Sequence, residues 1–184
     1  MTAASSCCPR YEADMRSINS LLLAACLLAS PIALAVDTQQ PINIQADSAT
    51  LDDARNNAVY RGDVIVTQGS MRLTGNQVTL TMNADGDINK LVSTGSPATW
   101  RQDPASGRGQ INARAQTIEY HAEAQRVVLI ERGHLDQAGD TFSGDLITYD
   151  INRRVVDAGR REGEAGSGQR IEITIQPRNR GGDN

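Results

Sequence analysis

The sequence predicts an all-β fold of antiparallel strands in which one structural unit is used twice. Short apolar runs rich in β-branched residues are separated by Gly, Asn, Asp and Ser, which is typical of strands joined by tight turns. In the clearest run, residues 78–82 (VTLTM), apolar side chains alternate with threonine. Side chains of a strand point alternately to its two faces, so one face is apolar and the other polar.

An internal repeat is the third observation behind this fold class. Residues 74–80 (TGNQVTL) are similar to residues 143–149 (SGDLITY), and residues 62–64 (GDV) are similar to residues 133–135 (GHL). Upstream of each copy, ATL at residues 49–51 corresponds to QTI at residues 116–118. A repeat of this kind indicates one supersecondary unit used twice and stacked to share a core.

The first 35 residues are predicted to be a secretory signal. Arg16 precedes an apolar stretch over residues 21–35 that ends in Ala-Leu-Ala, the small-x-small pattern of signal peptidase. The stretch is too short, and too soon followed by polar chain, for a typical transmembrane span. The mature chain is therefore expected to begin at Val36.

Two alternatives remain open within this leader. Met15 is a second candidate start, and Cys26 follows Leu-Ala-Ala as a lipidated cysteine does in a lipobox. All three cysteines, Cys7, Cys8 and Cys26, precede Val36. The mature protein therefore offers neither a disulfide nor a thiolate site.

Residues 36–177 are predicted to form one β-domain, followed by a disordered tail at residues 178–184 that has no apolar residue. Strands are expected at residues 39–47, 64–66, 71–73, 78–82, 88–92, 98–102, between 111 and 149, at 155–156 and at 170–176. Turns are expected at residues 52–57, 62–63, 68–70, 75–76, 83–87, 95–97 and 152–153. The Asp-Gly at Asp85 and Gly86 is the strongest hairpin signal.

The composition argues against catalysis, metal binding and nucleic-acid binding. The net charge is −4 and the charges are scattered singly, without a basic stripe. The two histidines, His121 and His134, have no metal-type spacing, and the 83–87 turn departs from the EF-hand pattern. The chain has no Gly-x-Ser-x-Gly motif and no P-loop. The sequence therefore predicts no enzyme, no cofactor and no metal.

Two stretches resemble a known family. Residues 41–47 (PINIQAD) are similar to the opening strand of the OstA-like domain of the LptA/LptH family of periplasmic lipopolysaccharide transport proteins. Residues 60–69 (YRGDVIVTQG) are similar to the most recognisable segment of that domain. The resemblance covers roughly residues 36–177.

The resemblance implies a twisted, V-shaped antiparallel β-jelly roll with an apolar trough. It implies that this trough carries lipopolysaccharide from inner to outer membrane, with the lipid A acyl chains inside. It also implies head-to-tail self-association, and docking to an LptC-like inner-membrane and an LptD-like outer-membrane β-domain.

Site residues follow partly from the resemblance and partly from the strand pattern. The family's lipid-facing positions carry over to Thr38, Ile42, Trp100, Tyr120 and Ala122, where Ala122 is smaller than the usual aliphatic residue. Ile44, on the face of Ile42, and the aromatic Phe142 complete the predicted lipid-binding set. The alternative is a structural or assembly β-domain of the cell envelope with the same strands and a closed core.

Overall fold

The computed structural model describes residues 40–103, 109–159 and 170–177. The chain divides into two units, Met1–Leu34 and Ala35–Asn184, and all described residues belong to the second. The predicted signal at residues 1–35, with Cys26, and the predicted tail at residues 178–184 lie outside the described residues.

The described residues form one antiparallel β-sheet, as predicted, with no α-helix among them. The strands are β1 (Asn43–Gln45), β2 (Ser48–Asp52), β3 (Asn57–Gln68), β4 (Met71–Met82), β5 (Ile88–Gln102), β6 (Ile111–His121), β7 (Arg126–Gln137), β8 (Asp140–Asp150), β9 (Val155–Gly159) and β10 (Glu172–Thr174). A 3₁₀ turn, Asp53–Arg55, lies in the predicted polar turn at residues 52–57. Within the described ranges, no helix has the length and hydropathy needed to cross a bilayer.

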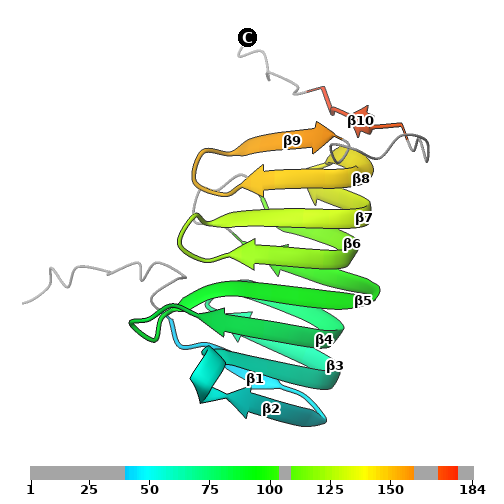
Figure 1. Cartoon of the computed structure of the whole chain (residues 1–184). Helices are drawn as coiled ribbons and strands as arrows, with labels where there is room; N and C mark the ends of the chain where they lie inside the picture. The colour runs from blue at the N-terminus through cyan, green and yellow to red at the C-terminus, as the bar shows by residue number, and fades with distance from the viewer. Residues whose placement is uncertain (1–39, 104–108, 160–169, 178–184) are drawn as a thin grey trace, which may run out of the picture. The chain divides into compact units, whose positions relative to one another are not determined.

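The long strands β3 to β8 pair in sequence order, so the sheet is a meander. Figure 1 shows them stacked in this order, with β1 and β2 at one end and β9 and β10 at the other. The sheet does not close on itself, and its end strands have unpaired edges within the described part of the chain.

Several predicted turns are wrong because they are bulges inside continuous strands. Gly62-Asp63 interrupts the pairing of β3 with β4, and Gly75-Asn76 interrupts the pairing of β4 with β5. Residues 95–97 likewise lie inside β5, where the register shifts between Thr94 and Ala98. A bulge needs the same permissive residues as a turn, but it bends a strand without ending it.

Gly62 shows why one of these bulges needs glycine. Its φ is +83°, and an added Cβ would overlap the carboxylate of Asp47. The backbone N–H of Asp47 donates to the carbonyl oxygens of Arg61 and Gly62, at 3.0 and 3.2 Å. Asp47 lies where the chain passes from β1 to β2, so the bulge fixes this crossing.

The register shifts divide the sheet into two layers. The first layer contains residues 57–61, 77–82, 88–94, 117–121, 126–130 and 146–150, and the second contains residues 64–68, 71–75, 98–102, 111–115, 133–137 and 140–144. At the N-terminal end, β2 pairs with the first-layer half of β3 and β1 with its second-layer half. At the C-terminal end, β9 and β10 divide β8 in the same way.

One aromatic contact shows that the two layers face each other. Trp100 pairs with Leu73 and Ala113 in the second layer, whereas Tyr120 pairs with Leu91 in the first. The two rings are therefore not neighbours within the sheet, yet their centroids lie 4.8 Å apart. They meet across the interior, which is the core of the domain.

Candidate functional site

Two rows of inward-facing side chains cross the sheet from one end strand to the other. The first-layer row is Leu51, Ala58, Leu80, Leu91, Tyr120, Val127, Tyr149 and Val156. The second-layer row is Ile44, Val66, Leu73, Trp100, Ala113, Leu135, Phe142 and Ile173. Each consecutive pair lies directly opposite on neighbouring strands, so each row is one continuous apolar stripe.

Each row is buried in the middle and exposed at one end, while its other end, Val156 in the first layer and Ile44 in the second, is partly buried. Leu91 and Trp100, at the centre, are 0% and 1% exposed. Leu51, which ends the first-layer row in β2, is 68% exposed, and Ile173, which ends the second-layer row in β10, is 51% exposed. The apolar interior therefore reaches both end strands without a polar closure.

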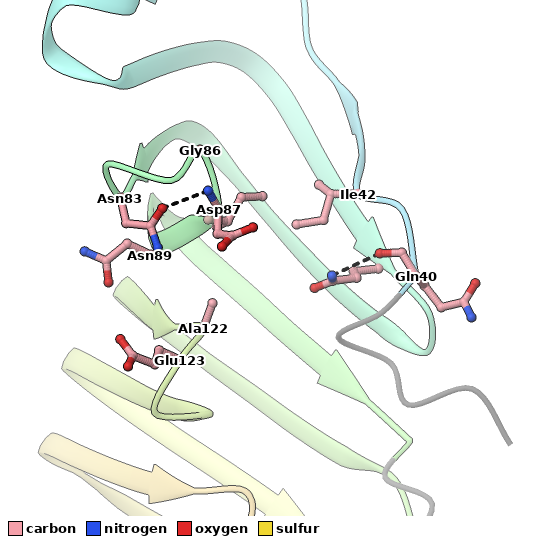
Figure 2. Close-up of a pocket in the computed structure, with 10 residues that line it drawn as sticks. Gln40, Ile42, Asn83, Gly86, Asp87, Asn89, Ala122 and Glu123 are labelled. Atoms are coloured by element: carbon pink, nitrogen blue, oxygen red, sulfur yellow. Dashed lines mark hydrogen bonds between the residues drawn. The ribbon is translucent and has the colours of Figure 1, made fainter.

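A pocket of about 610 Å³ opens between the free ends of the two layers. Ile42 lies on one side of it, and Ile88 and Ala122 lie on the other. Figure 2 shows Ile42 directed into this space, with Ala122 and the 83–87 hairpin across from it. The structure thus brings together Ile42 and Ala122, two predicted site residues that are far apart in the sequence.

The rim of this pocket is polar and held by hydrogen bonds. Asn83 Oδ1 accepts from the backbone N–H groups of Asp85 and Asp87, at 3.0 and 2.9 Å. On the opposite side, the Gln68 amide donates to the carbonyl oxygen of Gln40 at 3.0 Å. A small apolar floor within a fixed polar rim suits a ligand with a hydrocarbon part and a polar part.

The remaining predicted site residues lie on the two rows. Ile44, Trp100 and Phe142 belong to the second-layer row, and Tyr120 belongs to the first-layer row. Trp100 and Tyr120 are buried, whereas Ile44 and Phe142 are partly buried against the core. Thr38 lies outside the described residues.

Sequence reasoning missed most of both rows, among them Leu51, Leu73 and Leu135. Their alternation with polar neighbours assigns each to an apolar face, but nothing in the sequence states which residues lie opposite one another. That pairing depends on the bulges, which shift the register within each strand.

The outer face of the second layer carries His134. Its Nδ1 shares a hydrogen bond of 2.9 Å with Ser143 Oγ, and His134 lines a shallow pocket with Arg114 and Asp136. Burial and the neighbouring Arg114 charge lower the pKa of His134 below its usual 6.5, and Asp136 partly offsets this. Both predicted surface histidines lie on strands, since His121 is the last residue of β6 and pairs with Lys90.

His134 gives a pH-dependent contribution to stability. Its pKa is lower in the folded state, so unfolding takes up a proton between the lowered pKa and about 6.5. This contribution is present above that window and is lost as the pH falls through it. We expect the His134→Asn variant to lose less thermal stability than wild type on acidification across this window, measured by circular dichroism. Identical pH profiles for the two proteins would contradict this assignment.

Comparison with known proteins identifies the family. Residues 43–155 match the model of the LptA/(LptD N-terminal domain) LPS transport protein family. The lipopolysaccharide export system protein LptH of Pseudomonas aeruginosa is 46% identical over 171 residues, covering 89% of this chain and 98% of LptH. The export system protein LptA of Escherichia coli K12 is 30% identical over 177 residues, covering 94% of this chain and 95% of LptA.

A solved structure supports the same assignment. The crystal structure of LptH, the LptA-homologous periplasmic component of the lipopolysaccharide transport device of Pseudomonas aeruginosa, superposes with a TM-score of 0.71 at 46% identity. The match covers 77% of this chain and 99% of that one. The chain therefore belongs to the LptA/LptD N-terminal domain family of lipopolysaccharide transport proteins.

Proposed function

We propose that this protein binds lipopolysaccharide between its two β-layers and carries it through the periplasm from the inner to the outer membrane. The observation that carries this proposal is the pair of apolar rows that cross the whole sheet, the first-layer row ending at the exposed Leu51 and the second-layer row at the exposed Ile173. The relatives named as lipopolysaccharide export proteins, and the periplasmic LptH structure, support the same function.

The acyl chains are the part of the lipid that this interior suits. Transfer of each methylene from water into an apolar environment contributes about 0.8 kcal/mol. Several chains lying along the rows would gain many such contributions, while sugars and phosphates remain at the polar rim. The pocket lined by Ile42, Ile88 and Ala122 is the proposed entrance.

Two features of the described sheet support entry of such a ligand. Each long strand passes from the first layer to the second at its bulge, so the layers are joined along the line of bulges. The strand ends far from the bulges line the pocket and leave it open between the layers. The Trp100–Tyr120 contact crosses between them. Acyl chains would replace contacts of this kind, so that apolar surface stays covered whether or not the lipid is bound.

The protein is proposed to act without catalysis of its own, since its relatives are named export proteins. Its proposed partners are LptC-like inner-membrane and LptD-like outer-membrane β-domains, together with further copies of itself. The exposed end strands support this, because an unpaired strand edge accepts a strand from another molecule. A cleaved signal over residues 1–35 would place the mature chain in the periplasm.

The alternative, a structural envelope domain whose core stays closed, is not favoured by the named relatives. Leu73, Leu91 and Ile118 are fully buried, as in an ordinary core. An apolar fluorescent dye discriminates the two functions. A transport protein should bind it and release it on adding lipopolysaccharide, whereas a closed core should leave its emission unchanged.

Two neighbouring substitutions test where the lipid lies. Ile42 lines the pocket, whereas Asn43 is exposed and its neighbouring position in the chain directs it to the other face. We expect Ile42→Asp to weaken lipopolysaccharide binding at least about tenfold, because a carboxylate without a partner would be buried against acyl chains. Asn43→Asp adds the same charge as a control and should change affinity less than about twofold. Equal losses in dye-displacement titrations would show that the lipid does not use this face.

A further inference from the structure

The indole N–H of Trp100 is buried and has no hydrogen-bond acceptor among the residues that the structure describes. The Trp100 side chain is 1% exposed, and its neighbours along the second-layer row, Leu73 and Ala113, offer only hydrocarbon. The ring of Tyr120 lies 4.8 Å away, tilted by 44°. A polar donor is thus held in an interior whose two rows are apolar, although Gln102, two residues further along β5 on the same face, is also buried.

This arrangement is unusual for a tryptophan that serves only as packing. An indole N–H can donate but cannot accept, and a buried tryptophan normally finds an acceptor. A phenylalanine would supply apolar ring surface at this position without desolvating a donor. The unmatched N–H therefore points to an acceptor that arrives with a ligand.

Trp100 also lies on the route that an entering acyl chain would follow. Ala122 lines the pocket at the entrance, and Tyr120 is the next residue of β6 on the same face. Tyr120 is buried and contacts Trp100 across the interior. A chain that enters beside Ala122 and follows this face of β6 therefore reaches Tyr120 and its contact with Trp100.

We propose that the Trp100 N–H donates a hydrogen bond to a hydroxyl oxygen carried on the acyl chain. Trp100 is then a specificity-determining residue, which favours hydroxylated acyl chains over unsubstituted acyl chains of equal length. It also sets the depth of the chain, with its oxygen at Trp100 and its methylenes along the apolar rows. This inference rests on the proposed function.

A pair of simple probes isolates the hydrogen bond. Tetradecanoic acid and 3-hydroxytetradecanoic acid differ by one hydroxyl, and both can be titrated against the apolar dye. We expect the wild-type protein to bind the hydroxy acid about 2 to 10 times more tightly, the range for one neutral hydrogen bond. Trp100→Phe keeps a ring but removes the N–H, so the preference should disappear.

The control removes a different polar group from the inner face. Tyr60 is partly buried against the core and lies opposite the buried Val78. Tyr60→Phe deletes one hydroxyl and should keep the preference for the hydroxy acid. A preference that survives in Trp100→Phe, or is absent from wild type although both acids bind, overturns the inference.

Trp100 is the only tryptophan of the chain, so its own spectrum reports the bond without a variant. In ultraviolet resonance Raman spectra, the indole band that is sensitive to N–H hydrogen bonding should shift with the hydroxy acid and stay unchanged with tetradecanoic acid. An indole already hydrogen-bonded before lipid is added would overturn the inference. If neither acid nor lipopolysaccharide displaces the dye, the proposed function itself fails.

Discussion

Replacing Leu91 with alanine is expected to lower the free energy of unfolding by about 2–5 kcal/mol, the range for large-to-small changes in a packed core. Leu91 is fully buried in β5, one of the central strands, and lies opposite Leu80 and Tyr120 in the first-layer row. Backbone hydrogen bonds hold the neighbouring strands in place, so their side chains can move only partly into the cavity that Leu91→Ala would leave. Urea denaturation followed by circular dichroism measures the loss.

Leu51 provides a matched control within the same row. It is also a leucine on a strand and faces the same interior, but it is 68% exposed in β2 at the end of the sheet. Leu51→Ala should change the stability of the isolated chain by less than about 0.5 kcal/mol, as surface substitutions usually do. Similar losses of stability at Leu51 and Leu91 would contradict a row that is buried at its centre and exposed at the Leu51 end.

Alternation along each strand made the face of most residues predictable. Val78 and Leu80 were assigned to an apolar face by their spacing alone, and both are buried. The same rule predicts that His121 and Tyr120 point to opposite faces of the strand. His121 lies on the outer face together with Glu119, and its Nε2 is 3.4 Å from Glu119 Oε2. A period of two is a local property, so it can be read from local sequence.

The bulges could not be separated from turns in the same way. Gly62-Asp63 and Gly75-Asn76 have the composition of hairpin turns, yet the chain continues through them in one strand. A bulge differs from a turn in how the segments before and after it pair with neighbouring strands. This pairing joins residues far apart in the sequence, so it cannot be read from local sequence. For this reason the layers, and with them the contact between Trp100 and Tyr120, could not be derived from the local strand pattern.

Burial of the last strand was also predicted wrongly for the isolated chain. Alternation of isoleucine with polar residues over residues 170–176 predicts a half-buried strand, but Ile171, Ile173 and Ile175 are 43%, 51% and 70% exposed. β10 pairs only with β8 among the described strands, so one edge and much of its apolar face lack neighbours. The alternation over residues 170–176 therefore fits a strand whose isoleucine face becomes buried when another molecule covers it.

A second copy of the chain is the proposed cover. β1 and β2 present the corresponding edges at the other end of the sheet, where the rows end in Ile44 and Leu51. Pairing of these strands with β10 and β9 of a neighbour would satisfy the unpaired backbone groups and continue both apolar rows across the junction. Contact between two different ends does not close into a ring by itself, so it produces chains of variable length.

Self-association should therefore depend on the inward face of β10. We expect the mean mass of the wild-type protein, measured by light scattering, to rise with concentration. Ile173→Asp should weaken association at least about tenfold, because it places an unpaired carboxylate inside the new junction. Thr174→Asp introduces the same charge on the opposite face of the same strand and should still associate.

A chain that ends at Gly168 lacks β10 altogether, and its mean mass should remain that of a monomer at every concentration. Wild-type protein that remains monomeric at every concentration, and that captures no inner-membrane partner domain, would contradict end-to-end assembly, since both contacts would use the same exposed edges.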